Sequence, residues 1–465
     1  MPSRMPIQHS REYRFRRTLN WLPMGLTYAF LYMGRYNLTV SKNALGDLMT
    51  KEDFGIIFAV GTITYAIAFL INGPLTDRIG GKRAILIAAF GSATMNILMG
   101  LTIHHMLTQG MKMNLRLAFS LLYAGNMYFQ SYGAVAIVKV NASWFHVRER
   151  GIFGGIFGVL ISLGIYFAFD WGSAIVEATR ATVTSHLNPV QQALRTVLGV
   201  QGSTIDQTWW VFFAPAALLF TFFIIELFLL RDRPSQAGFE DFNTGDASSG
   251  EADKPFRLGE ILKRVLTNRI ILTIALIEFC SGVMRNGIMH WYPIYIKEAL
   301  HYSPDQFMRA NWGLILMLAG VTGGLFAGVL SDKVFGSRRG PVAALLYGMM
   351  LAGVIAMNFT LQAPWYILGA IVAFMSLSVI GVHGMLSGTS TMDFGGQRAA
   401  ATAVGMIDGF VYLGTGVQSF ALGFLTTAKW SYWPPFLLPF AVIGLVLSIR
   451  IWHAFPQPAK KTGGH

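Results

Sequence analysis

The sequence predicts an all-α, polytopic membrane protein with twelve transmembrane helices in two six-helix halves. Three observations point to this class: long apolar segments recur along the chain, basic residues gather in the short loops between them, and the second half repeats motifs of the first. Of 465 residues, 53% are hydrophobic and 13% are charged. A soluble domain carries about 25% charged residues, so the composition excludes an ordinary soluble protein.

Each predicted helix is an apolar run that is long enough to cross the hydrocarbon core of a bilayer, which takes about 20 residues. In chain order, we place these helices near residues 20–46, 54–75, 83–104, 114–143, 150–171, 208–230, 268–297, 306–331, 340–359, 363–390, 398–425 and 431–453.

Polar segments divide the chain into domains. The segment 231–267 is rich in Ser, Gly, Asp and Pro, which predicts a flexible cytoplasmic linker. A second polar insert, at about 175–207, separates the fifth and sixth helices on the opposite side of the membrane. The predicted domains are a cytoplasmic N-terminal segment 1–19, a six-helix bundle 20–230, the linker 231–267, a second six-helix bundle 268–453 and a cytoplasmic tail 454–465.

The net charge of +13 indicates membrane topology rather than nucleic-acid binding. The basic residues lie in short loops on one side of the apolar runs, and both termini are basic and fall on the same side, so that side is expected to be cytoplasmic. The apolar run after the basic N-terminus is too long for a signal peptide and is expected to be retained as the first helix. The single cysteine, Cys280, excludes an intramolecular disulfide and a multi-thiolate metal site.

Two loop motifs repeat between the halves. GPLTDRIGGKR begins at Gly73 and GVLSDKVFGSRRG begins at Gly328, and each joins the second and third helices of its half. The glycines are expected to let these helices approach a neighbour closely. Asp77 and Asp332 are expected to accept charge-assisted hydrogen bonds from a nearby arginine or a helix N-terminus and so to latch one gate state. The alternative is a solvated charged turn that only sets topology. The predicted gating residues are Gly73, Asp77, Arg78, Arg83, Asp332, Lys333 and Arg339.

Arg35 and Arg285 lie deep inside the first helix of each half, at about the same depth from the same side. A buried charge at that depth costs several kcal/mol, so these residues are expected to be functional. A guanidinium offers a planar fork of donors that suits phosphate or carboxylate, and two of them supply two positive charges to a dianion. The sequence therefore predicts a site for a small anion between the halves. The alternative is a helix-packing arginine paired with Glu278 or Asp408.

These segments carry a family resemblance. The paired loop strings resemble the signature of the major facilitator superfamily. YMGRYNLTVSKNALGDLMTKEDFG and VMRNGIMHWYPIYIKEAL, with the strings of the fourth and eleventh helices, resemble the organophosphate:phosphate antiporter family through both halves. The resemblance implies a major facilitator fold, alternating access, phosphate binding by Arg35 and Arg285, and exchange of a phosphorylated organic anion for inorganic phosphate. The short loops and compact linker suit a bacterial inner membrane, and we expect a monomer. The sequence has neither an ATP-binding motif nor a nucleophile–base arrangement, so we expect no catalytic activity, cofactor or metal.

The rest of the pocket departs from that family. Its well-known members have a lysine where Phe69 aligns, a histidine near Leu160 and an acid at His290. Ordinary glycerol-phosphate specificity is therefore not expected. Further candidates for contact with the substrate, each equally able to bridge helices, are Tyr36, Asn37, Tyr65, Asn126, Tyr128, Gln130 and His290.

Two alternatives to anion exchange remain open. A proton-coupled symporter of an organic carboxylate would use the same arginines, with Asp408, Glu278 or His290 carrying the proton. A membrane sensor that resembles the transporter-like receptors of sugar-phosphate regulation would bind the ligand and signal through the basic cytoplasmic surface or the linker 231–267.

Overall fold

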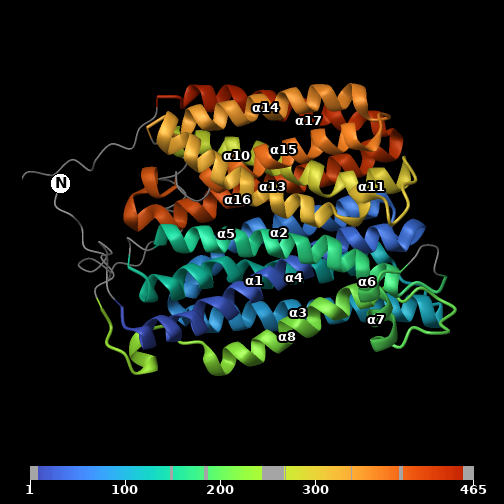
Figure 1. The fold of residues 1–465 in the computed structure, drawn as a ribbon, viewed down its shortest axis with the longest axis horizontal. Coiled ribbons are helices and arrows are strands. Elements are labelled where there is room, and N and C mark those ends of the chain that lie inside the picture. The colour runs from blue at the N-terminus through green and yellow to red at the C-terminus, as the bar shows by residue number, and fades with distance from the viewer. Residues whose placement is uncertain are drawn as a thin grey trace, which may run out of the picture.

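The computed structural model of the chain is a bundle of long helices that lie side by side and roughly parallel (Figure 1). It describes residues 9–146, 150–182, 187–242, 267, 269–336, 338–386 and 391–453, with the backbone alone at 150–157, 332 and 391–406. Within these ranges the regular structure is helical throughout. The predicted all-α class is therefore confirmed.

The first three helices of the N-terminal half start earlier than the apolar pattern indicates, and the other three start within two residues of the predicted positions. These helices are α1 (Arg11–Leu45), α2 (Lys51–Ile79), α3 (Gly81–Gln109), α4 (Leu115–Trp144), α5 (Arg150–Tyr166) and α8 (Trp210–Leu229). A π-helical turn, η3 (Phe167–Trp171), extends α5 into α6 (Gly172–Ala178), and α7 (Pro189–Val197) lies in the polar insert. α1 begins well before the predicted residue 20 because the side chain of Ser10 accepts a hydrogen bond from the backbone N–H of Tyr13 and caps the helix.

The C-terminal half repeats this arrangement. Its helices are α10 (Arg269–Met289), α11 (Trp291–Glu298), α13 (Trp312–Val329), α14 (Arg339–Thr360), α15 (Trp365–Met385), α16 (Thr391–Ala428) and α17 (Trp433–Arg450), with a short α12 (Phe307–Ala310) before α13. α10 and α11 together fill the predicted helix 268–297, so a helix occupies each of the twelve predicted positions. Most of the linker 231–267 and the tail 454–465 lie outside the described residues, and the domain boundaries stay predictions.

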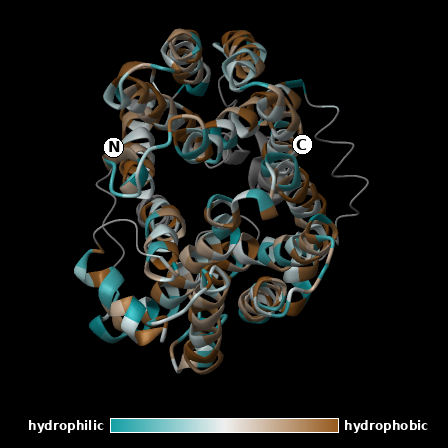
Figure 2. Cartoon of the chain, turned by 90° about the vertical axis from the view of Figure 1, so that its right-hand side faces the viewer, coloured by the Kyte–Doolittle hydropathy of each residue, from teal (hydrophilic) through white to brown (hydrophobic). Residues whose placement is uncertain are grey.

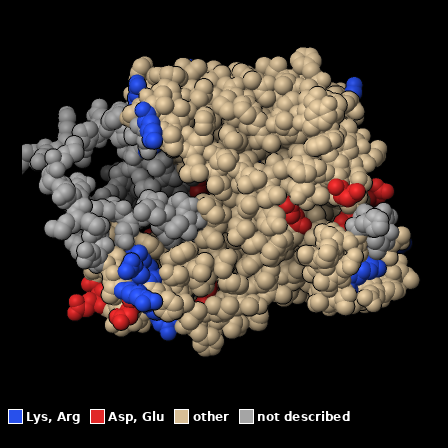
Figure 3. All heavy atoms as spheres, in the orientation of Figure 1, with Lys and Arg blue, Asp and Glu red and all other residues tan. Residues whose placement is uncertain are grey.

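The bundle has the surface of a membrane protein. Nine helical segments in the described ranges are long and apolar enough to cross a membrane. Seen along the helix axes, most of the helical ribbon is hydrophobic (Figure 2). On the face shown in Figure 3, charged side chains gather toward the two ends, and few interrupt the broad band between them. Such a band suits contact with lipid.

Glycines bring the helices of the C-terminal half into close contact. A Cβ on Gly282 of α10 would collide with the backbone carbonyl of Val411 on α16, and one on Gly414 would collide with the carbonyl of Phe279. Small residues let helix backbones approach in this way in membranes. The α10–α16 contact therefore holds the helix that carries Arg285 firmly against its neighbour.

The two halves are tied together at one end of the bundle. We call the end at which α1 begins and α8 ends the terminal end, and the end at which α1 and α11 end the distal end. At the distal end, the Lys42 ammonium lies 2.7 Å and the Lys51 ammonium 3.3 Å from the Glu298 carboxylate. These ion pairs join α1 and α2 to α11 across the interface of the halves.

A second tie lies on the other side of the same interface. The Asp170 carboxylate, in the π-helical turn after α5, accepts hydrogen bonds from the backbone N–H groups of Gly313 (2.6 Å) and Leu314 (2.9 Å). These groups stand at the N-terminus of α13, where unpaired N–H groups and the helix dipole favour an anion. One half thus caps a helix of the other.

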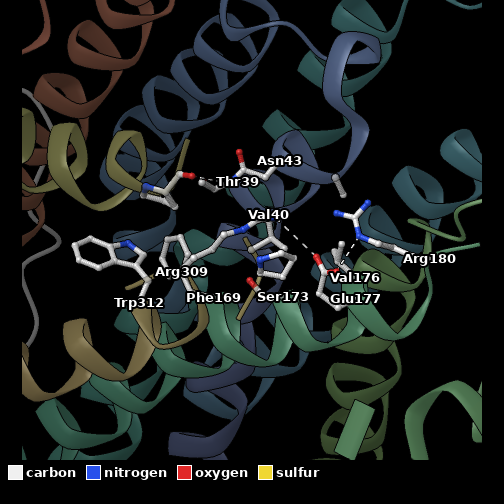
Figure 4. Close-up of a pocket in the computed structure, with 13 residues that line it drawn as sticks. Thr39, Val40, Asn43, Phe169, Ser173, Val176, Glu177, Arg180, Arg309 and Trp312 are labelled. Atoms are coloured by element: carbon white, nitrogen blue, oxygen red, sulfur yellow. Dashed lines mark hydrogen bonds and ion pairs between the residues drawn. The ribbon is translucent and has the colours of Figure 1, made fainter. Parts of the chain in front are cut away.

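A small cavity of about 50 Å³ lies beside this tie, between α1, α6 and α13 (Figure 4). Its charged residue Glu177 lies between two arginines, 3.0 Å from Arg180 Nε and 3.9 Å from Arg309 Nη2. Burial lowers the pKa of the Arg309 guanidinium, and the charge of Glu177 opposes that shift. Because Arg309 and Glu177 come from different halves, this cluster adds to the closure of the distal end.

Candidate functional site

Arg35 lies at the centre of the bundle and is fully buried. Its Nε donates to Gln130 Oε1 on α4 (2.8 Å), and its Nη1 donates to the Tyr412 hydroxyl on α16 (2.6 Å). Its Nη2 is buried and has no hydrogen-bond partner. Two fixed bonds therefore hold the guanidinium in place while one donor nitrogen stays uncommitted.

Tyrosine rings surround the Arg35 guanidinium. Its Cζ lies 4.7 Å from the ring centroids of both Tyr32 and Tyr65, 5.7 Å from that of Tyr412 and 5.9 Å from that of Tyr36. Cation–π attraction of this kind stabilises a desolvated charge without neutralising it. The predicted candidates Tyr36 and Tyr65 thus lie beside Arg35.

Neither Tyr32 nor Tyr412 is among the residues predicted from the sequence. Tyr32 carries a usable signal, because a residue three positions before Arg35 shares its face of α1. Tyr412 carries none, since its place beside Arg35 depends on how α16 packs against the other half.

Arg285 approaches the same tyrosines from the C-terminal half. It is half-buried on α10, and its Nε is buried without a hydrogen-bond partner. It interacts electrostatically with the phenols of Tyr32, Tyr36 and Tyr412, and all three also interact with Arg35. The structure therefore brings the two predicted arginines to one cluster of tyrosines.

A polar network behind Arg35 sets the orientation of Gln130. The Gln130 Nε2 donates to Ser92 Oγ (3.2 Å) and to Asn126 Oδ1 (3.1 Å), which leaves its oxygen for Arg35. Asn126 and Asn96 both donate to the Gly34 carbonyl, at 2.9 Å and 3.2 Å. The predicted residues Gln130 and Asn126 therefore support the site, and Ser92 and Asn96 of α3 are additions that the sequence did not reveal.

Three predicted contact residues lie away from the Arg35 guanidinium. The Asn37 amide donates to Asn96 Oδ1 (2.8 Å) and to the Val211 carbonyl (3.2 Å), so it faces α3 and α8. Tyr128 is 37% exposed and lies on the opposite face of α4 from Gln130. His290 forms a separate contact, and for all three a role in substrate binding stays a prediction.

His290 links the halves near the distal end. Its Nδ1 lies 2.7 Å from Thr39 Oγ1 on α1, and its Nε2 lies 3.1 Å from Asn286 Oδ1. The ring is buried against Tyr36 and Phe58, with centroids 4.8 Å and 4.5 Å away. In this conformation both ring nitrogens have protein partners.

The expectation of close helix approach at the loop glycines is wrong for this structure. A Cβ added to Gly73 or to Gly328 would meet no atom within 4 Å. These glycines lie near the terminal end, whereas the ties between the halves described above lie at the distal end, so no neighbouring helix crowds them. Close backbone contact occurs at other glycines, such as Gly282 of α10 and Gly414 of α16.

The gating aspartates are only partly described. Asp77 is exposed and its carboxylate lies 2.6 Å from the Lys139 ammonium of the same half, so its partner is a lysine rather than the expected arginine or helix end. The Asp332 side chain lies outside the described residues. Arg339 donates to Ser331 Oγ (2.7 Å), while Arg78, Arg83 and Lys333 are exposed. Their gating role stays a prediction.

The buried acid Glu278 does not hold Arg285 in a hydrogen bond. Its Oε2 lies 2.9 Å from His383 Nδ1 on α15, and its Oε1 is buried without a hydrogen-bond partner. Asp408 is half-buried on α16. The structure therefore does not show the alternative in which Arg285 is a helix-packing residue hydrogen-bonded to Glu278.

Known proteins resemble the chain over nearly its whole length. Residues 24–419 match the family model of the Major Facilitator Superfamily. A probable hexose phosphate transport protein of Chlamydia trachomatis is 26% identical, covering 97% of this chain and 94% of that protein. A glycerol-3-phosphate transporter of Bacillus subtilis is 24% identical over 95% and 93% of the two chains. The membrane sensor protein UhpC of Salmonella typhimurium is 25% identical over 94% and 90%.

Solved structures agree on the fold. A bacterial homolog of the human lysosomal transporter Spinster, in an inward-facing and unoccupied conformation, superposes with a TM-score of 0.75 at 14% identity, covering 96% of this chain and 98% of that one. These relatives confirm the resemblance predicted from the sequence. The chain is an integral membrane protein and belongs to the Major Facilitator Superfamily.

Proposed function

We propose that the protein is a secondary active transporter that exchanges a small phosphorylated organic anion for inorganic phosphate by alternating access. The observation that carries this proposal is the pair of guanidiniums, Arg35 and Arg285, that meet at one tyrosine cluster with buried N–H donors still unused. A phosphate group offers several acceptor oxygens and two negative charges, and it complements both.

Exchange follows from the cost of the empty site. Without an anion, two positive charges, one fully buried and one half-buried, interact with the same cluster of neutral phenols. Moving such a site through the membrane interior is costly, and a bound anion removes most of that cost. The halves therefore reorient more readily when loaded, whether with the organic phosphate or with inorganic phosphate.

The relatives support the chemical class of the substrate. The transporters among them are named for hexose phosphate and for glycerol-3-phosphate. Phe69 is buried against Tyr65, with ring centroids 5.3 Å apart, so position 69 contributes an aromatic ring and not a cation to the pocket. We infer that the arginine pair binds the phosphate and that aromatic rings face the organic part.

We further propose a monomer in a bacterial inner membrane with both termini in the cytoplasm. The closed distal end then faces outward, and the central site is reached from the terminal end. The bacterial transporters among the relatives support this assignment.

The test is uptake of labelled inorganic phosphate into proteoliposomes that are empty or preloaded with phosphate. We expect uptake only with internal phosphate, and competition by external sugar phosphates or glycerol phosphate. A folded protein that shows no exchange would contradict the proposal. If that protein nevertheless bound phosphate, the membrane sensor would become the better assignment, since one relative is a membrane sensor protein.

Gln130→Glu is expected to raise the external phosphate concentration needed for half-maximal exchange by about tenfold or more, because the neutral acceptor of Arg35 Nε becomes a carboxylate whose ion pair with Arg35 competes with the anion. Initial rates of exchange at a series of external phosphate concentrations measure this half-saturation value. Asn72→Asp is the control, because it adds a carboxylate where Asn72 bonds Ser131 (2.7 Å) rather than Arg35. An unchanged half-saturation value in Gln130→Glu would contradict a role for Arg35 in anion binding.

A further inference from the structure

Glu278 and His383 form a buried acid–base pair within the C-terminal half. Glu278 is fully buried on α10, and His383, on α15, is 24% exposed. Their only mutual contact is the 2.9 Å approach of Glu278 Oε2 to His383 Nδ1, and Glu278 Oε1 has no hydrogen-bond partner. A carboxylate this poorly solvated is stable only beside a positive charge or with a proton bound.

One bound proton makes the pair neutral. It resides either on the Glu278 carboxyl or on the His383 imidazole, and both forms keep the hydrogen bond between them. Removal of that proton leaves a net negative charge in the membrane interior. This charge then requires another cation.

Arg285 is the cation in position to supply that charge. It follows Glu278 by seven residues, which is about two turns, so both side chains project from the same face of α10. The two groups interact electrostatically, and the Arg285 Nε is free of hydrogen bonds. The guanidinium thus has two possible anionic partners, which are the deprotonated pair on one side and the substrate on the other.

Among the described residues, the other polar groups around Glu278 do not supply a competing positive charge. On α10 the neighbouring group is the Cys280 thiol, and on α14 the Tyr347 hydroxyl donates to the Ile277 carbonyl at 2.6 Å. α16, which packs along α10, contributes the half-buried carboxylate of Asp408. Asp408 is itself acidic and cannot neutralise a second carboxylate.

We propose that Glu278 and His383 form a proton-binding site that competes with the substrate anion for Arg285. The proposal rests on the anion transport proposed above and adds its coupling to protons. With the proton bound, the pair is neutral and Arg285 binds the anion. When the proton leaves, the negative pair attracts Arg285 and weakens the anion site. By linkage, proton and anion therefore favour each other's binding.

The coupling predicts how the protein responds to pH. In the wild type, the apparent affinity for inorganic phosphate falls by up to about tenfold per pH unit above the range in which the pair loses its proton. Glu278→Gln keeps the site neutral at every pH, so this component of the dependence disappears. His383→Gln removes the acceptor that shares the proton and changes the pH range of the effect.

The experiment is calorimetric titration of purified protein with inorganic phosphate, in buffers of different ionisation enthalpy, across a range of pH. The ionisation of phosphate itself contributes equally in all variants, so the difference between wild type and Glu278→Gln isolates the proton of the pair. We expect the wild type to take up a fraction of a proton more than Glu278→Gln. Glu226→Gln is the matched control, because Glu226 is a second buried membrane carboxyl, which accepts from Thr27 Oγ1 (2.8 Å) in the other half.

The outcomes separate the two proposals. Phosphate binding with the same proton uptake and pH profile in wild type and Glu278→Gln would overturn the proton site and leave the anion site standing. Absence of phosphate binding by the wild type would overturn both. If Glu278→Gln does not fold, Glu278→Asp is used instead. A shift in the pH dependence of phosphate binding in this variant supports the proposal, and an unchanged pH dependence refutes it.

Discussion

Phosphate exchange is expected to fall by at least about 100-fold when either Arg35 or Arg285 is replaced by lysine, although the positive charge is kept. The guanidinium of Arg35 donates from Nε to Gln130 and from Nη1 to Tyr412, and its Nη2 stays available to the anion. A lysine ammonium cannot keep two fixed partners and offer a planar donor to the anion. Loss of two charge-assisted bonds, at about 1.5–3 kcal/mol each, corresponds to this factor.

Initial rates of exchange in proteoliposomes measure the effect. Arg116→Lys is the control, because Arg116 is 46% exposed at the start of α4 and pairs with Asp53 rather than with the central site. Exchange above about a tenth of the wild-type rate in both central variants would show that charge alone suffices, and the fork geometry of the site would be refuted.

Removal of the Asp170 carboxylate is expected to open the distal end. Asp170→Ala leaves two backbone N–H groups at the start of α13 without their acceptor. Each bond to a charged group contributes about 1.5–3 kcal/mol, so loss of both shifts the conformational equilibrium by at least about tenfold. Gly313→Val is expected to act in the same direction, since a Cβ at this position would lie 2.8 Å from Asp170 Oδ1 and 3.0 Å from the Tyr166 carbonyl.

Opening is measured by the labelling rate of a cysteine placed in the distal cavity. Ser173→Cys in a Cys280→Ser background gives one reporter thiol, because Cys280 is the only cysteine of the chain. We expect a membrane-impermeant thiol reagent to label the Asp170→Ala protein at least about tenfold faster. Asp232→Asn is the control, since Asp232 also accepts from a backbone N–H, that of Lys82 (2.7 Å), but within one half and away from the distal cavity. Equal labelling rates in all three proteins would show that the tie does not hold the halves together.

The helices and the central arginines could be predicted from the sequence because they depend on local physics. An apolar run of sufficient length must form a helix in a membrane, since its backbone finds no other partners there. The depth of Arg35 and Arg285 follows from counting residues along such runs, and the repeated strings around Gly73 and Gly328 align the halves. Only the ends of the helices differ from the prediction, as at α1, where the Ser10 cap rather than hydrophobicity sets the first residue of the helix.

The sequence by itself therefore determined the membrane fold, the two-half architecture and the pair of central arginines. Only the tertiary structure decided which side chains meet: Tyr412 with Arg35, His383 with Glu278, and Asp170 with the start of α13. These partners lie on different helices, far apart along the chain, and their contact depends on the rotation and tilt of each helix. Packing against neighbours sets those two quantities, and the hydrophobic pattern of a helix surrounded by lipid and protein leaves them undetermined.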